Sequence, residues 1–281
     1  MKYIGRKPRA PLDVYIDDLY VLAGNSEDRR RLNIPPMPSA HLMVNLGDPV
    51  SIQEPAGGVA VPMSSGGWFM GLRTRRFIVE YGAKVLVIGV HFKPWGLAPF
   101  IPIPPGELRD GWVPADVLWG ASVDRLREQL VAARSVEEML EQLENELQAR
   151  LVPELSSGMN LVSGAALTVA ASWGAIPVTA LVDKAGVSSN RLAAAFTAQV
   201  GVGPKRLSRI YRFAHLLLSI DASRPVNWAE LADAVGYYDQ PHLINDFKGF
   251  TGLTPSAYLE LRCRHPQDVG DPMDRGPMPT E

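Results

Sequence analysis

Short apolar runs alternate with clusters of proline, glycine, asparagine and aspartate over residues 1 to about 120. Apolar runs bounded by turn-forming residues are typical of β-strands, and several in succession predict a sandwich or a small barrel. The predicted strands are Val14–Leu22, His41–Leu46, Val59–Met63, Phe77–Glu80 and Val85–Phe92. Five prolines between Pro94 and Pro105 predict an ordered loop that crosses the surface, because proline cannot donate to a β-ladder.

The pattern then changes to a helical period. Ser122–Ala133 and Ser135–Leu151 place their apolar residues three and four apart, which predicts two amphipathic helices. Ser135 followed by Glu138 is a capping box. Such a helical hairpin can cover the strands or pair with a second subunit. We favour packing on its own sheet, because amphipathic helices usually face their own core.

A segment without charged side chains follows, from Leu155 to Val182. It is long enough to cross a bilayer, but it is rich in serine, glycine, alanine and threonine, and Pro177 interrupts it. Small, weakly apolar residues insert poorly into membranes. We therefore expect no membrane span, and predict a buried helix over about Asn160–Trp173.

The stretch from Gly236 to Pro255 has the pattern of a helix-turn-helix unit. Asp239 suits the N-cap of a helix, and Leu243 and Phe247 lie on one face of that helix. Gly252 suits its C-terminal end. The polar side chains left outside are Gln240, His242, Asn245 and Lys248. A short helix, a tight turn and a second helix with outward polar groups is the layout of a DNA-reading unit.

The same pattern occurs earlier in the chain, over about residues 178–204. Its positions match the second unit at an offset of 50 before the turn and 51 after it. A duplicated supersecondary unit explains this register. Between the copies, Pro204 to about Ile220 predicts a linker helix with a basic stripe. Its position favours contacts between Lys205, Arg206 and Arg209 and DNA phosphates, to which Lys248 of the second unit is added.

Two motifs carry a family resemblance, AGVSSNRLAAAFTAQVGVGPKRL in the first copy and VGYYDQPHLINDFKGFTGLTPSAYL in the second. With them, residues of about 160–264 resemble the DNA-binding module of the AraC/XylS family of bacterial transcription regulators. The resemblance implies two reading helices in successive major grooves. By position it assigns base readout to Asn190, Ala193, Ala194, Gln240, Pro241 and Asn245. To these candidates for base readout we add their neighbours Ser189, Arg191 and His242. Because alanine offers only a methyl contact, we expect the second unit to supply most of the polar readout.

The N-terminal half resembles the uncharacterised β-rich domain found ahead of some AraC-type modules. The motifs HLMVNLGDP, GVHFKPWGLAPF and ELRDGWVPADVLWG carry this similarity. It implies a cupin-like domain that senses a ligand or mediates dimerisation. The fold class expected overall is α+β. It comprises a β-rich domain at 1–153 with a helical hairpin at 122–151, an all-α double helix-turn-helix domain at 159–264, and a disordered tail at 265–281.

Composition narrows the functions further. The net charge is −2, so any surface for DNA must be local. The single cysteine, Cys263, excludes a disulfide framework, and with the lack of an apolar signal segment it indicates the cytoplasm. His41 and His91 are isolated in sequence, so we expect neither a metal nor another cofactor. Arg73, Arg75 and Arg76 fit either an anion site or a solvated turn, and we favour the turn. A ligand pocket is a weaker hypothesis, with His41, Trp68, Glu80, His91, Phe92 and Trp95 as its lining.

The sequence therefore predicts a DNA-binding transcriptional regulator without enzymatic activity. Its predicted partners are double-stranded promoter or operator DNA, RNA polymerase, a small-molecule effector and a second copy of the chain, but no membrane. Two alternatives stay open, a metallocupin-type enzyme and a DNA-alkylation repair protein, each with an appended AraC-type module. The sequence lacks the metal-binding cluster that the first would need and the cysteine cluster that the second would need.

Overall fold

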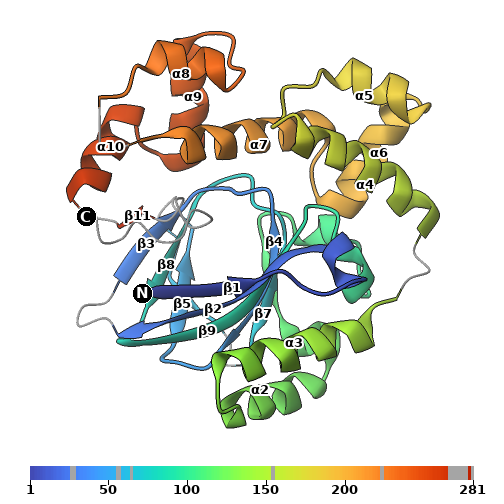
Figure 1. The fold of residues 1–281 in the computed structure, drawn as a ribbon, viewed down its shortest axis with the longest axis vertical. Coiled ribbons are helices and arrows are strands. Elements are labelled where there is room, and N and C mark those ends of the chain that lie inside the picture. Colours follow the sequence, from blue (N-terminus) through green and yellow to red (C-terminus); the bar gives the residue numbers. More distant parts are fainter. Residues whose placement is uncertain are drawn as a thin grey trace.

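The computed structural model of the chain describes residues 1–25, 30–54, 58–63, 66–152, 156–221, 225–264 and 278–279. Strands make up most of the N-terminal part, and helices make up the C-terminal part (Figure 1). The helical part lies across one end of the strands, and a helical hairpin lies on the opposite side in this view. The predicted α+β fold class is confirmed.

The strands form two antiparallel sheets. In spatial order, the first sheet contains β1 (Lys2–Arg6), β2 (Ile16–Asn25), β9 (Lys84–Phe92), β4 (Ala40–Asn45), β7 (Trp68–Met70) and β10 (Trp112–Pro114). The second contains β11 (Met278–Pro279), β3 (Arg30–Ile34), β8 (Phe77–Tyr81), β5 (Val50–Gln53) and β6 (Val61–Pro62). All five predicted strands form, with ends that differ by a few residues. The sequence pattern missed β1, β3, β5, β7 and β10, which are short or lack a long apolar run.

Alternation along β4 gives the first sheet two different faces. Leu42 and Val44 pack into one apolar core beneath the helices of the N-terminal part. Their neighbours His41 and Met43 point to the other side, toward the second sheet and the space between the two sheets. Trp68 and Met70 on β7 share that inner side with residues of the second sheet. The interior between the sheets is therefore lined by alternate residues of both.

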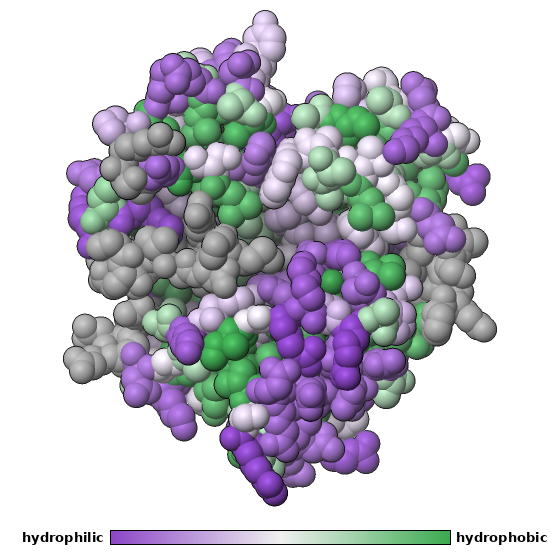
Figure 2. Space-filling view, viewed as in Figure 1, coloured by the Kyte–Doolittle hydropathy of each residue, from purple (hydrophilic) through white to green (hydrophobic). Residues whose placement is uncertain are grey.

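Helices cover the outer face of the first sheet: α1 (Ala115–Trp119), α2 (Ser122–Ala132) and α3 (Val136–Arg150). Leu126 and Leu130 of α2 and Leu143 of α3 are buried in the same core as Leu42. The predicted packing of the hairpin on its own sheet is confirmed. Hydrophilic side chains prevail below the strands, where α2 and α3 lie (Figure 2).

The proline-rich segment is not the surface loop that we predicted. Residues 94–101 are all buried, and part of the segment forms a short 3₁₀ helix, η2 (Ala98–Phe100), against α3. The Phe100 carbonyl accepts a hydrogen bond from Trp119 Nε1 at 2.8 Å. The prolines do exclude a strand, but the apolar side chains between them draw the segment into the core. A second short helix, η3 (Pro105–Leu108), follows, and a third, η1 (Leu12–Val14), precedes β2.

The described C-terminal part is helical. Its helices are α4 (Ser156–Ala171), α5 (Val178–Ala185), α6 (Ser189–Val200), α7 (Pro204–Ser219), α8 (Trp228–Ala234), α9 (Gln240–Thr251) and α10 (Pro255–Arg264). Helix α7 joins two helical groups, one at each of its ends (Figure 1). The predicted pair of helix-turn-helix units with a linker helix is confirmed. Among the described helices, none is long and apolar enough to cross a membrane.

The predicted tail lies mostly outside the described residues. Within it, Met278 and Pro279 form β11 and pair with Asn33 and Leu32 of β3. The disorder expected of residues 265–277 and 280–281 stays a prediction.

Strand β1 is tied to the hairpin through Glu144 of α3. The Glu144 side chain is fully buried and accepts hydrogen bonds from Arg6 Nη2 at 2.8 Å and from both the backbone and the side chain of Arg9. Burial raises the pKa of Glu144 and the hydrogen bonds from Arg9 and Arg6 lower it, with a net lowering. Glu144 is thus an ionised anchor for the segment that begins with β1.

We expect Glu144→Ala to lower the free energy of unfolding by about 2 kcal/mol. Removing one partner of a fully buried pair costs about 3–5 kcal/mol, and less is expected here because solvent screens the exposed side chain of Arg9. Urea denaturation measures the change. Glu141→Ala, on an exposed position of the same helix, is the control and should stay within about 0.5 kcal/mol. Equal losses for the two variants would contradict the anchoring role.

Candidate functional site

The two reading helices begin and end in the same way. At the start of α6, Ser188 Oγ accepts from the Arg191 backbone N–H, and at the start of α9, Asp239 Oδ1 accepts from that of His242 at 2.8 Å. Each helix ends at a glycine with a positive φ, Gly201 or Gly252. The duplication seen in the sequence therefore extends to both caps.

The first turns of α6 and α9 present the predicted base-reading residues to solvent. Exposed side chains include Ser189, Asn190, Arg191 and Ala194 on α6, and Gln240, Pro241 and Asn245 on α9. His242 is half-buried, because its ring packs edge-on against Tyr237, with centroids 5.1 Å apart. The structure thus places all eight of these residues in the first two turns of the two helices, with seven of them exposed. Whether they contact bases stays a prediction.

The four predicted phosphate contacts fall into two groups. Lys205 and Lys248 are exposed, whereas Arg206 and Arg209 are half-buried and bound to other parts of the protein. Arg206 Nη2 donates to the Thr74 carbonyl of the N-terminal part, and its guanidinium carbon lies 4.9 Å from the centre of the Phe250 ring. Burial lowers the pKa of Arg206. In this conformation, the two lysines are the freer pair for phosphate binding.

Arg209 holds the second reading helix against the linker helix. Its Nη2 donates to Asp246 Oδ1 of α9 at 2.6 Å, and the Asp246 side chain is almost fully buried. The hydrogen bond with Asp246 raises the pKa of Arg209. The sequence contained a signal for this pair that we did not use. Asp246 lies between Leu243 and Phe247 on the buried face of its helix, where a carboxylate needs a partner.

Residues of the N-terminal part contact the C-terminal ends of both reading helices. At α9, Asn33 Nδ2 donates to the Thr251 carbonyl at 2.9 Å, and the Arg76 side chain lies against Gly252. The φ of Gly252 is +77°, which favours glycine, and a Cβ there would lie 2.6 Å from Arg76 Nε and displace that side chain.

At α6, the backbone of Gly106 packs so closely on the Thr197 carbonyl that a Cβ would overlap it. The Arg109 side chain packs beside Gly201, with its Nη1 3.5 Å from the carbonyl oxygen of that glycine. We call these two sets of contacts the clamp: Asn33 and Arg76 at α9, and Gly106 and Arg109 at α6. The clamp fixes both reading helices relative to the strands and leaves their first turns exposed.

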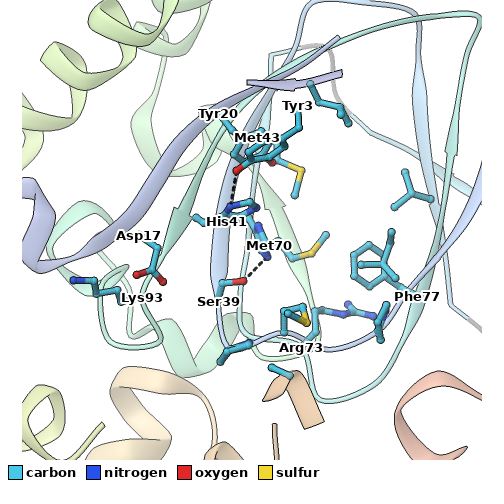
Figure 3. A pocket seen from close by; sticks show the side chains of 18 of the residues that line it. Tyr3, Asp17, Tyr20, Ser39, His41, Met43, Met70, Arg73, Phe77 and Lys93 are labelled. Carbon is cyan, nitrogen blue, oxygen red and sulfur yellow. Dashed lines mark hydrogen bonds between the residues drawn. The ribbon is translucent and has the colours of Figure 1, made fainter. Parts of the chain in front are cut away.

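A cavity of about 460 Å³ lies between the two sheets (Figure 3). Most of its wall is apolar, with Met43 and Met70 from the first sheet and Phe77 and Val79 from the second. The helical part closes one end of the cavity. The side chains that do so are Leu167 and Ala170 of α4, Trp173 after it, and Tyr211, Ala214 and Leu218 of α7. The cavity volume is within the range of small-molecule sites, which are mostly apolar with few polar groups.

A row of polar side chains crosses the first sheet at this cavity. His41 and His91 are cross-strand neighbours with ring centroids 4.9 Å apart, and His91 Nδ1 lies 2.7 Å from Asp18 Oδ1. Burial raises the pKa of Asp18, but the hydrogen bonds with His91 and Tyr3 lower it by more. The pKa of Asp18 therefore lies below its usual value. His41 Nε2 lies 3.1 Å from Ser39 Oγ (Figure 3). Burial, with His91 nearby, lowers the pKa of His41 well below 6.5.

The sequence spacing indicated that the two histidines are isolated from each other, and this is wrong. Antiparallel pairing of β4 and β9 brings them together. Within the described part of the chain, no group of three or more histidine, cysteine, aspartate or glutamate side chains is arranged to hold a metal ion.

Of the six predicted pocket residues, His41, Trp68, His91 and Trp95 line the cavity. Phe92 follows His91 along β9 and therefore points to the opposite face, where it is buried in the core beneath the hairpin. Glu80 alternates with Val79 and faces outward, near Arg31. Arg73 also lines the cavity and is 2% exposed, so the solvated turn that we favoured for it is wrong.

Two family models match separate parts of the chain. A family model described as a helix-turn-helix domain matches residues 181–261, and one described as a domain of unknown function matches residues 5–114. No curated protein matches the chain by sequence.

Among solved structures, an apo single-residue variant of ToxT from Vibrio cholerae is 12% identical, with a TM-score of 0.47, and the match covers 91% of this chain and 99% of that one. Wild-type ToxT with a bound unsaturated fatty acid is 11% identical, with a TM-score of 0.48 and coverages of 90% and 96%. The AraC-like transcriptional activator CuxR is 14% identical, with a TM-score of 0.26 and coverages of 77% and 86%. We infer no ligand from these low scores.

The helix-turn-helix match and the two exposed reading helices define a class, the DNA-binding transcriptional regulators. Within that class, the C-terminal module is of the AraC type. Its N-terminal part matches a domain to which no function is assigned.

His41 makes stability depend on pH. Its pKa in the folded protein lies below the unfolded value of 6.5, so the unfolded chain binds the proton first as the pH falls. The stability is complete above pH 6.5 and decreases below it. We expect the wild type to lose more free energy of unfolding than His41→Gln between pH 7.5 and pH 5 in urea denaturation. Parallel pH profiles for the two proteins would contradict this.

Proposed function

We propose that this protein is a sequence-specific transcriptional regulator whose affinity for DNA is controlled by an effector bound between its two sheets. Helices α6 and α9 read two successive major grooves. One observation carries the proposal. Helix α7 joins both reading units and also forms part of the cavity wall, through Tyr211, Ala214 and Leu218. An occupant of the cavity therefore touches the helix on which both readers depend.

The dimensions support reading of adjacent grooves. Helix α7 has 16 residues and is therefore about 24 Å long at 1.5 Å per residue. Major grooves on one side of DNA recur every ~34 Å. Helix α6 ends just before α7 begins, and α9 packs along α7 through the pair of Asp246 and Arg209. Exposed Lys205 and Lys248 flank the readers and suit the phosphate contacts that position a protein on DNA.

The clamp provides a route from the cavity to the readers. Arg73 lines the cavity, and the next residue, Thr74, accepts the hydrogen bond from Arg206 of α7. Arg76, which rests on the end of α9, follows in the same loop. A shift of this loop on ligand binding would change how the reading helices are held. Control of DNA binding then needs only an effector that prefers one arrangement of the clamp.

A homodimer and a contact with RNA polymerase stay predictions. The apolar face of hairpin α2–α3 is already used against the first sheet, so we do not assign a dimer interface to it.

Selection of bound sites from random DNA tests the double reader. We expect two information blocks about one helical turn apart. Gln240→Ala and Asn245→Ala should each reduce discrimination at one position of the block read by α9, where a good bidentate contact is worth about 1–3 kcal/mol. Asn190→Ala should have a smaller effect on the other block.

Gln148→Ala, an exposed amide on α3, is the matched control and should leave the selected sequence unchanged. A featureless selection would contradict the double reader. Loss of all preference in Asn190→Ala, with Gln240→Ala and Asn245→Ala unchanged, would contradict the larger share that we assign to the second unit.

A second prediction concerns the spacing of the two blocks. Because the clamp fixes both reading helices, the wild type should lose affinity when one or two base pairs are inserted between the blocks. The double variant Arg76→Ala/Arg109→Ala should tolerate these insertions better, and its spacing profile should be flatter. Binding to a series of spaced operators measures the profile. Arg75→Ala, which alters an exposed arginine between Arg73 and Arg76, is the control. An unchanged profile in the double variant would mean that the clamp does not set the spacing.

A further inference from the structure

The cavity wall contains buried nitrogen atoms without a hydrogen-bond partner. Among the described residues that line it, these are Nδ1 of His41, Nε1 of Trp68 and Nε of Arg73. The Trp68 and Arg73 nitrogens can only donate, since neither carries an acceptor. Buried polar groups in folded proteins are nearly always satisfied, and unsatisfied ones need an explanation.

Arg73 is the most constrained of the three. Its Nη1 donates to the Asp110 carbonyl and its Nη2 to Glu54 Oε1, each at 2.5 Å. The guanidinium carbon lies 4.8 Å from the centre of the Phe77 ring, at the edge of the cavity (Figure 3). These contacts hold the guanidinium in place and leave its Nε–H without an acceptor. A preformed donor of this kind suits a ligand oxygen, because no side chain must be reordered on binding.

The charged residues that line the cavity indicate whether the ligand oxygen is neutral or negatively charged. Lys7, Arg73 and Lys93 line the cavity, against one carboxyl group, that of Asp17. Burial raises the pKa of Asp17, although Lys93 opposes this shift. An excess of cations in a largely apolar space favours a ligand with one negative charge. Most of the remaining wall, including Met43, Met70 and Phe77, offers only apolar contacts.

We propose that the cavity binds an amphipathic monocarboxylate. Its carboxylate accepts from Arg73 Nε, and its apolar body lies between the sheets against Met43, Met70 and Phe77. This assignment rests on the proposed function, in which the cavity is the effector site. It names the chemical class of that effector.

The test uses the full-length protein without DNA and three probes with one chain length: decanoate, decanol and decyltrimethylammonium. Isothermal titration calorimetry below their micelle concentrations gives the affinities. We expect decanoate to bind at least tenfold more tightly than decanol, and the cation not to bind. Arg73→Gln should remove the preference for decanoate and leave decanol binding unchanged. Decanol binding also shows that the cavity of this variant is intact.

Two further variants keep the test decisive if Arg73→Gln does not fold. Met43→Trp fills the cavity and should abolish binding of both decanoate and decanol. Arg75→Gln removes a neighbouring cation that does not line the cavity, and should change neither affinity. Equal affinities for decanoate and decanol, or a preference that survives Arg73→Gln, would overturn the proposal. So would decanoate binding that survives Met43→Trp.

A parallel DNA-binding measurement separates this proposal from the proposed function. If decanoate binds as expected but leaves DNA affinity unchanged, the ligand class stands and the effector role fails. If the selected DNA shows two blocks but decanoate does not bind, the regulator stands and the ligand class fails.

Discussion

Burial of helix α7 on two sides is the constraint on which the rest of the structure depends. Ile210, Phe213 and Leu217 pack into the core of the helical part. Tyr211, Ala214 and Leu218, on the adjoining side of the same helix, close the cavity of the β-rich part. A helix that is apolar on more than one face is stable only between two packed layers. The two parts of the chain therefore share this helix and do not simply lie beside each other.

This arrangement changes the role of the basic residues on α7. Arg209 and Arg212 hydrogen-bond to Asp246 and to the Gly174 carbonyl inside the helical part, and Arg206 bonds to Thr74 of the β-rich part. Half-buried guanidinium groups suit such roles, because their planar donors satisfy several acceptors at once. Arg206 and Arg209, which the sequence pattern predicted to contact DNA phosphates, thus help to hold the two reading units and the strands together.

Contacts between the two parts of the chain also explain the composition of α4 and the burial of Trp95 and Leu72. Helix α4 lacks charged side chains because Val162 and Val169 pack in the helical core and Leu167 and Ala170 face the cavity. Trp95 and Leu72 come from the β-rich part but pack into the core of the helical part. These contacts, together with the clamp, link the cavity to both reading helices through a few adjoining residues.

Local pattern in the sequence determined the elements of this protein and the repeat of the reading unit. Asp239, Leu243, Phe247 and Gly252 act through the N-cap, the helical period and the C-cap, which depend only on near neighbours in the chain. Helix boundaries and the exposure of Gln240 and Asn245 therefore follow from residues a few positions away. The hairpin and the predicted strands follow in the same way.

Only the tertiary structure decided which distant residues meet. His41 and His91 become neighbours through strand register, whereas Phe92, one residue further along, turns to the opposite face. Arg73 is buried because Glu54 and the Asp110 carbonyl bind it from separate segments. Such pairings depend on the order and register of strands, and a shift of one residue would reverse every side chain. The cavity and the clamp are products of that register, so no local pattern in the chain could have located them.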